Sequence, residues 1–285
     1  MKKFLLVLLA ASPLLASCSA TRVAYDNFGI VARFMGGRYL DLDSAQWDEL
    51  KPRIAGFHRW HRVNELPLYA ALLRSASQRA ARGITAEDVE WGIANVRARM
   101  RRFAAKAAED AAPVLSTLEP AQLAALDHRF AENNEKYARE YLAADDTRRR
   151  RAQLRRAIGR FSEFAGELTE EQQARIERFL LAHERHVVLR FEDRRHWQRD
   201  ALALLRQQHP PRELGRRLAE TFLRPELRRS EEFLREDRRW EEDFAQLVVE
   251  LDRSMSARQR AHVVGRLRDY AEDAAVLSGR PRESA

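Results

Sequence analysis

Residues 168–191 read LTEEQQARIERFLLAHERHVVLRF, and this stretch decides the fold class. Thr169 and Gln172 form a capping box, in which each side chain binds the backbone at the other end of the first helical turn, and an apolar residue precedes them. Apolar residues and one histidine then follow at spacings of three or four, which is typical of one face of a helix. The stretch therefore predicts a long amphipathic helix over residues 170–208, which needs helical partners.

The same short pattern recurs along the chain: an apolar residue, a cap, two further residues and then Gln or Asp. Each copy predicts the start of a helix. The intervals between copies, 42, 34, 50 and 87 residues, are too uneven for a regular solenoid. The copies are Leu42-Asp43-Ser44-Ala45-Gln46, Ile84-Thr85-Ala86-Glu87-Asp88, Leu118-Glu119-Pro120-Ala121-Gln122, Leu168-Thr169-Glu170-Glu171-Gln172 and Met255-Ser256-Ala257-Arg258-Gln259.

Nearly every other long segment also has helical periodicity, whereas alternating β-branched runs and hairpin dipeptides are missing from the sequence. One C-terminal segment carries a coiled-coil-like seam of Phe233, Trp240, Phe244, Leu247 and Leu251. We therefore predict an all-α fold, an elongated antiparallel bundle of long helices with coiled-coil-like packing. The predicted helices cover residues 44–63, 67–82, 86–112, 120–141, 147–166, 170–208, 212–222, 225–252 and 257–277, with a short helix within 21–40.

The composition limits the class of protein. The chain has 285 residues, of which 45% are hydrophobic and 33% charged, so it can bury a sizeable core. A single cysteine excludes a disulfide scaffold, and only 11 glycines exclude collagen. After residue 17 there is no long uncharged apolar run, which excludes a polytopic membrane protein.

The N-terminus has the features of an export signal. A positive start, Met1-Lys2-Lys3, precedes an apolar segment too short to span a bilayer. The segment ends in Leu15-Ala16-Ser17-Cys18, which resembles the lipobox of bacterial lipoproteins. The resemblance implies cleavage between Ser17 and Cys18, and attachment of a diacylglycerol and an acyl chain such as palmitate to Cys18. The alternative is an ordinary secretory signal with an incidental cysteine.

Ser19 and the net charge bear on location and partners. In the lipoprotein systems that the N-terminus resembles, Asp after the lipidated cysteine retains the protein on the inner membrane. Ser19 therefore favours the periplasmic face of the outer membrane, with the membrane as a partner through the lipid on Cys18. The formal net charge is +8, but export leads us to expect no nucleic-acid partner.

These features divide the chain into segments. We predict a lipoprotein signal peptide over 1–17 and a lipidated N-terminus with its tether over 18–40. A helical domain covers 41–277, with a sub-boundary near 144–168 as an alternative to a single unit. Residues 278–285 are predicted to be a disordered tail.

Two histidine pairs are candidates for metal ligands. His58 and His61 are three residues apart, as are His183 and His186, so each pair can share one helix face. Glu65 extends the first pair on the same face. A single helix offers too few ligands for a closed site, so we predict no metal and no cofactor and keep the histidines as the alternative.

The run of Arg148, Arg149, Arg150 and Arg151 is the densest basic cluster. It predicts contact with anionic lipid headgroups or another anionic envelope polymer. The alternative is a solvated helix face whose arginines pair with neighbouring acidic residues. A second basic cluster, within residues 97–106, allows the same two interpretations.

A set of aromatic residues predicts core packing, with the lining of a hydrophobic groove as the alternative. The set consists of Phe161, Phe164, Phe179, Phe222, Phe233, Trp240 and Phe244. Catalytic signatures such as Gly-x-Ser-x-Gly, His-Glu-x-x-His, a P-loop or Gly-x-Gly-x-x-Gly are missing. We therefore predict that the protein is not an enzyme.

Four short motifs follow the lipobox: Arg22-Val23-Ala24-Tyr25-Asp26-Asn27, Tyr39-Leu40-Asp41-Leu42, Trp60-His61-Arg62 and Glu65-Leu66-Pro67-Leu68-Tyr69. With the lipobox and these motifs, the chain resembles an uncharacterised family of helical lipoproteins from Gram-negative bacteria, known only as a domain of unknown function. The resemblance covers nearly all of the mature chain and implies an address and a fold but no mechanism.

Residues 168–172 also resemble the LTxxQ motif of small periplasmic stress chaperones, although a capping box alone explains Thr169 and Gln172. We predict a non-enzymatic, lipid-anchored envelope protein that presents a helical surface to an envelope protein or anionic polymer. One alternative is a chaperone that binds unfolded clients on a concave apolar surface. The other is a metal-binding protein or enzyme that uses the histidine pairs.

Overall fold

The computed structural model describes residues 22, 25–142 and 146–279, and within this part of the chain it contains helices and no strand. The predicted all-α antiparallel bundle of long helices is confirmed. The elements are α2 (Phe28–Leu40), α3 (Ser44–Asn64), α4 (Leu66–Arg82), α5 (Ala86–Leu115), α6 (Pro120–Tyr141), α7 (Asp146–Ala165), α8 (Glu170–Ala182), α9 (Glu184–Arg206), α10 (Pro211–Leu223), the 3₁₀ turn η1 (Pro225–Leu227), α11 (Glu231–Arg253) and α12 (Ala257–Leu277).

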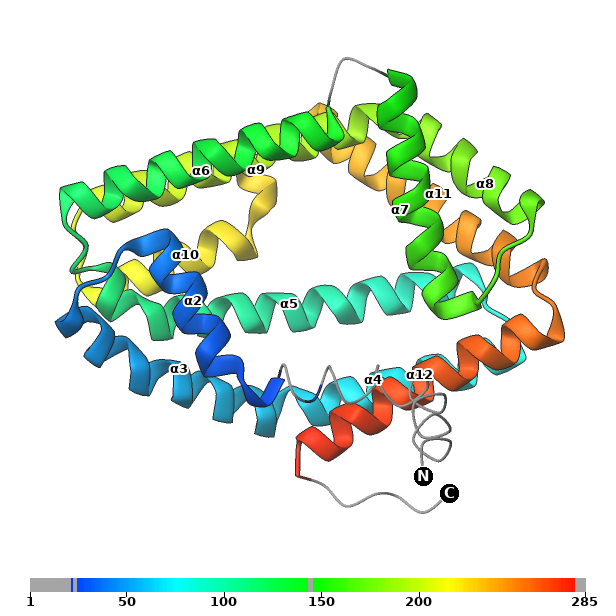
Figure 1. Ribbon diagram of the computed structural model, residues 1–285, viewed down its shortest axis with the longest axis horizontal. Coiled ribbons are helices and arrows are strands. Elements are labelled where there is room, and N and C mark those ends of the chain that lie inside the picture. The colour runs from blue at the N-terminus through cyan, green and yellow to red at the C-terminus, as the bar shows by residue number, and fades with distance from the viewer. Residues whose placement is uncertain (1–21, 23–24, 143–145, 280–285) are drawn as a thin grey trace, which may run out of the picture.

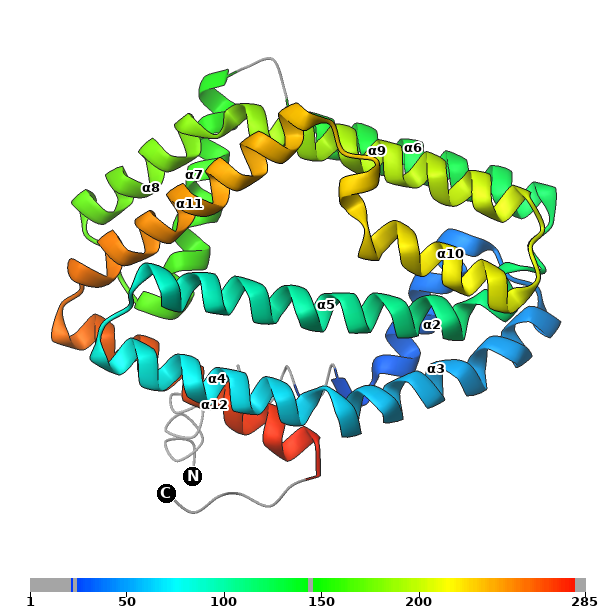
Figure 2. The same cartoon turned by 180° about the vertical axis from the view of Figure 1, so that it is seen from behind.

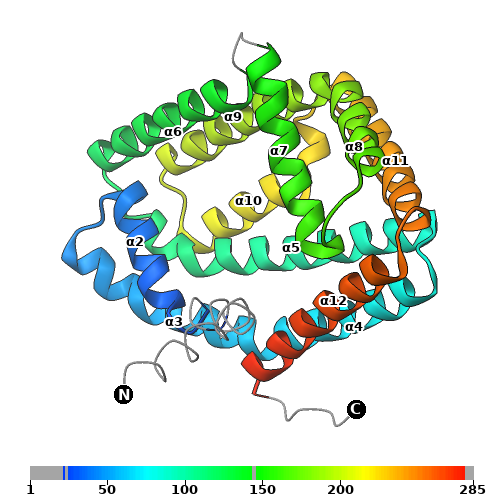
Figure 3. The ribbon, with the colours of Figure 1, turned by 45° about the vertical axis from the view of Figure 1, so that its right-hand side comes forward.

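The helices pair along the sides of a flattened ring rather than in one rod (Figure 1). The α6–α9 pair forms one long side, and the α4–α12 pair lies opposite it, as the reverse view also shows (Figure 2). The α8–α11 pair closes one end, with α7 across it, while α2 and α3 lie at the other end (Figure 3). Inside the ring, α5 packs against both α3 and α10.

Three apolar clusters lie within the sides and corners of this ring. The largest joins α5, α6, α9 and α10, the second joins α7, α8 and α11, and the third lies between α4 and α12. In the first cluster α10 approaches α5 closely because Gly215 has no side chain: a Cβ there would lie 3.2 Å from the Cβ of Ala112. The predicted seam of α11 packs against α8, where Ile176 is fully buried against Leu247 and Leu251.

The two halves of the chain share one order of elements. Each begins with a lead helix (α2 or α7) and continues into an interrupted helix (α3–α4 or α8–α9). A return segment follows (α5, or α10 with α11), and a last helix (α6 or α12) ends the half. The halves exchange partners, because α4 packs on α12 and α9 packs on α6. The helix-start pattern is therefore unevenly spaced because the unit that repeats is one half of the chain, present twice.

Four of the five predicted helix starts meet in two glutamine clasps. In the first clasp, Gln46 and Gln122 exchange side-chain amide hydrogen bonds of 3.1 and 2.7 Å, which join the starts of α3 and α6. In the second clasp, Gln172 and Gln259 do the same at 3.3 and 2.9 Å and join α8 to α12. Each glutamine also closes its own capping box. The fifth copy carries Asp88, which instead pairs with Arg79 and Arg82.

Two predicted helices are interrupted. The helix predicted over 170–208 ends at Ala182 and restarts at Glu184, because His183 leaves helical geometry at φ −117° and ψ 22°. The helix predicted over 225–252 begins only after Ser230, whose hydroxyl caps the backbone N–H of Phe233. Residues Arg228 and Arg229, just before this cap, are held by the carboxylate of Asp193 on α9.

The N-terminal part of the described chain is bound to the ring. Arg22 forms an ion pair of 2.7 Å with Asp273, which is buried on α12. Tyr25 packs with the apolar cluster between α4 and α12. The predicted cleavage and lipidation residues, Ser17, Cys18 and Ser19, lie outside the described residues, as do 280–285 of the predicted tail. No helix among the described residues combines the length and apolarity needed to span a bilayer.

Candidate functional site

The interior of the ring contains a cavity of about 950 Å³. One wall is the inner face of α5, and the others come from α9, α10 and α11, with contributions from α2 and α6. Three apolar side chains on this lining remain exposed: Val96 is 54% exposed, Met100 62% and Phe222 43%. Large apolar side chains that stay exposed on a cavity lining are typical of a binding surface, because burying them on a partner is favourable.

Charged groups at this cavity are partly neutralised. Arg97 forms an ion pair with Glu241 across the cavity, between α5 and α11. Arg101 and Arg190 also line it, and neither has a carboxylate partner within the described part of the chain. The acidic residues on the lining are engaged by arginines, so the cavity presents an excess of positive charge to any occupant.

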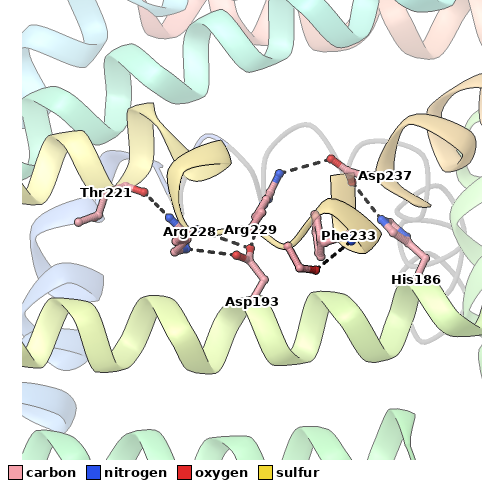
Figure 4. Close-up of polar contacts among 8 residues, drawn as sticks. His186, Asp193, Thr221, Arg228, Arg229, Phe233 and Asp237 are labelled. Carbon is pink, nitrogen blue, oxygen red and sulfur yellow. Dashed lines mark hydrogen bonds and ion pairs between the residues drawn. The ribbon is translucent and has the colours of Figure 1, made fainter. Parts of the chain in front are cut away.

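A polar network fixes one edge of the cavity by tying the α10–α11 connection to α9 (Figure 4). Arg228 donates to the backbone carbonyl of Thr221 at 2.6 Å and lies 3.1 Å from Asp193. Arg229 bridges Asp193 and Asp237, with 3.3 Å to each carboxylate. Asp237 is also 3.0 Å from Nε2 of His186.

The charges of this network balance, since two arginines face two carboxylates. Burial opposes the ionisation of Asp237, but the hydrogen bond from His186 and the charge of Arg229 outweigh it and hold the pKa of this carboxyl below its ordinary value. An ionised, fully paired carboxylate is a poor general base. The network therefore has a structural role. It holds the connection between α10 and α11 against α9, and these two helices carry Phe222 and Phe233 of the cavity lining.

The histidine pairs lie in aromatic packing. His61 shares a hydrogen bond of 2.9 Å with the hydroxyl of Tyr25, and His58 stacks on Phe28 with ring centroids 5.2 Å apart. His183, at the α8–α9 break, contacts Phe179 and lies 3.1 Å from Asp243. The structure brings neither pair to a third ligand: within the described ranges no three His, Cys, Asp or Glu side chains are arranged to hold a metal.

Burial gives the protein a pH-dependent stability. It lowers the pKa of His58, His61 and His183 below the ordinary value, although the carboxylate of Asp243 partly opposes this at His183. The unfolded chain therefore binds protons at a higher pH than the folded chain does. The stabilising contribution is complete above a pH of about 6.5 and is lost as the pH falls through the lowered folded-state pKa values.

We therefore expect the free energy of unfolding to fall between about pH 7.5 and about pH 5.5 in urea titrations. His183→Gln should make this dependence shallower, because it removes one of the three histidines whose pKa is lowered. The matched control is Leu181→Gln on the exposed surface of α8, which removes no titrating group and should leave the slope unchanged. An identical slope in the wild type and in His183→Gln would contradict the assignment.

The basic clusters are largely paired. In the predicted run, Arg149 contacts Asp146 and Glu184 at 2.8 and 3.0 Å, and Arg150 forms a two-point contact with Glu184. These pairs correspond to the alternative of a helix face that pairs with its neighbours, while contact of Arg148–Arg151 with an anionic surface stays a prediction. In the second cluster, Arg99 and Arg102 lie 3.5 and 2.9 Å from the buried carboxylate of Glu65.

The aromatic set divides between two cavities and the core. Phe222, Phe233 and Trp240 line the central cavity. Phe161, Phe164, Phe179, Trp240 and Phe244 line a second cavity, between α7, α8 and α11. Only Phe233 of this set is buried. The aromatic set thus corresponds to the alternative of a hydrophobic lining, divided between two neighbouring cavities that share Trp240.

Several residues of the site were not predicted from the sequence. Val96 and Met100 are four residues apart on one face of α5, a spacing that periodicity reveals but cannot distinguish from core packing. The ion pairs of Asp193 with Arg228 and Arg229 join residues about 35 positions apart, so no short sequence motif predicts them.

One comparison with known proteins gave a match. The profile described as a family of unknown function (DUF6279) matches residues 38–235. The matched span runs from the end of α2 to the first turns of α11, and it includes both histidine pairs and the first clasp. No curated protein and no solved structure matches the chain.

Proposed function

The chain belongs to a family of unknown function, DUF6279, and we propose that it is a non-catalytic binding protein of the cell envelope that holds partner polypeptides against the interior of its ring. The observation that carries the proposal is the central cavity, on which Val96, Met100 and Phe222 stay exposed. A soluble fold normally buries such side chains, and their exposure around one concavity favours an interaction site.

The lining also indicates the chemistry of the partner. Its apolar residues are flanked by Arg101 and Arg190, whose charges are not neutralised by a carboxylate of the described chain. A segment that combines apolar and acidic side chains would complement both features. An unfolded or partly folded envelope protein offers such segments. The cavity therefore favours chaperone-like binding of unfolded proteins.

The proposal is tested by a single charge placed on the apolar wall. Met100→Asp should raise, by about tenfold, the protein concentration that half-suppresses the aggregation of an acidic client such as reduced α-lactalbumin. The expected loss corresponds to one apolar side chain that can no longer be buried. Light scattering of the client during reduction measures it.

Val63→Asp is the matched control, because Val63 is 66% exposed and lies on α3 away from the cavity lining. This variant should suppress aggregation as the wild type does. Equal activity of Met100→Asp and the wild type would exclude the ring interior as the binding face.

We also propose that the binding ring is held at a membrane through lipid on Cys18, on the periplasmic face of the outer membrane as Ser19 favours. The lipobox-like Leu15-Ala16-Ser17-Cys18 supports this anchor, and so does the single cysteine, since lipidation leaves no free thiol in an oxidising compartment. Local tethering would raise the effective concentration of the ring near envelope clients.

A further inference from the structure

The second cavity has a volume of about 660 Å³ and lies between the two halves of the chain. The first half contributes the end of α4 and the start of α5, including Gly92 and Trp91. The second half contributes α7, α8, α11 and α12, among them Phe161 and Phe244. Apolar side chains make up most of this lining, and the volume falls within the range of small-molecule sites.

The charges on this lining do not cancel. Asp88 is paired with Arg79 and Arg82, and Asp252 is paired with Arg260 at 2.8 Å. This leaves Arg160 on α7 and Arg190 on α9, which have no carboxylate partner in the described part of the chain. An apolar cavity with two uncompensated guanidinium groups complements a molecule that has an apolar body and an anionic end.

We propose that this cavity binds a single-chain anionic amphiphile, with its hydrocarbon chain among the aromatic side chains and its anionic group near Arg160 and Arg190. A fatty acid and a lysophospholipid share this chemistry. The proposal does not rest on the binding of polypeptides in the central cavity, because Gly92, Phe161 and Arg160 line the second cavity alone.

Two tryptophans on the lining, Trp91 and Trp240, make binding observable. Dibromostearate added to the purified full-length chain should quench their fluorescence in a saturable way. The neutral dibromo-octadecanol should bind about tenfold more weakly, since it offers nothing to the two arginines. A brominated lysophosphatidylglycerol is the third probe. The ratio of its affinity to that of dibromostearate shows whether the cavity prefers a lysophospholipid or a fatty acid.

Gly92→Leu tests the location of the site. A Cβ at Gly92 meets no atom within 4 Å, so the new side chain can enter the cavity without displacing its neighbours. We expect this variant to abolish saturable quenching. Gly265→Leu is the matched control, because Gly265 is also helical, half-buried and free of neighbours within 4 Å but does not line the cavity.

Arg160→Gln tests the anionic end and should weaken the binding of dibromostearate about fivefold, the effect of one partly exposed ion pair. Arg155→Gln, five residues earlier on α7 and outside the lining, should have no effect. Equal binding of the charged and neutral probes, or unchanged quenching in Gly92→Leu, would overturn the proposal. Quenching that persists in Met100→Asp separates this site from the central cavity.

Discussion

Gln172→Leu is expected to lower the free energy of unfolding by about 3–5 kcal/mol, because it removes one half of a buried clasp. The side chain of Gln172 is only 1% exposed. Its Nε2 donates to the backbone carbonyl and the hydroxyl of Ser254, at 3.2 and 3.1 Å, and to Gln259. Its Oε1 accepts from the backbone N–H of Thr169 at 3.0 Å. Leucine would fill the space but leave the buried side chain of Gln259 without its partner, at about 1–3 kcal/mol, and it would also remove the bonds to Ser254 and Thr169, at about 1 kcal/mol each.

Equilibrium unfolding in urea measures this loss, with Gln173→Leu as the matched control. Gln173 is the next residue on α8 and only half-buried, and its side chain donates to the backbone carbonyl of Leu168 at 3.0 Å. We expect it to lose less than about 1 kcal/mol. If Gln172→Leu were no more destabilising than Gln173→Leu, the clasp would not stabilise the fold.

The two halves of the clasp should also be coupled. In the double variant Gln172→Leu/Gln259→Leu, each leucine replaces the group that the other would have left unpaired. The combined loss should therefore be smaller than the sum of the two single losses by at least about 1 kcal/mol. Additive losses would mean that each glutamine acts only through its own capping box.

The helix starts were predictable because capping is local. Asp43, Thr85, Glu119, Thr169 and Ser256 each precede a helix that begins at the next residue, as their sequence pattern predicted. The pairing of these starts was not predictable, since each clasp joins glutamines 76 or 87 residues apart. A capping box needs only four residues, but a clasp depends on the closure of the whole ring.

The break at His183 shows why the hydrophobic periodicity predicted one helix that is too long. The apolar stripe continues across it, so the pattern alone predicts one helix. The burial of both histidines instead depends on α11: His183 lies 3.1 Å from Asp243, and His186 stacks on Trp240. The cavities were hidden for the same reason: the aromatic residues were identifiable, but whether they meet a partner helix or open space is a tertiary property.

Cys18→Ser is expected to move more than about nine-tenths of the protein from the membrane to the soluble fraction, since stable anchoring needs more than one acyl chain and the serine accepts none. Fractionation of cell envelopes followed by immunoblotting measures the shift. Mass spectrometry of the wild-type mature N-terminus should find the sulfur of Cys18 as a thioether. Membrane association that survives Cys18→Ser, or an unmodified thiol, would refute the anchor.

Ser19→Asp is the companion variant, because it changes sorting and not lipidation. It should keep the protein in the membrane fraction but shift it from outer to inner membrane on a sucrose gradient.

The ion pair of Arg22 with Asp273 adds a structural consequence, since Arg22 is only four residues after Cys18. Four extended residues reach at most about 14 Å, so a lipidated Cys18 would hold the α12 side of the ring against the bilayer. Insertion of a flexible Gly-Ser spacer before Arg22 should then leave anchoring intact and increase the accessibility of α12 to a membrane-impermeant label.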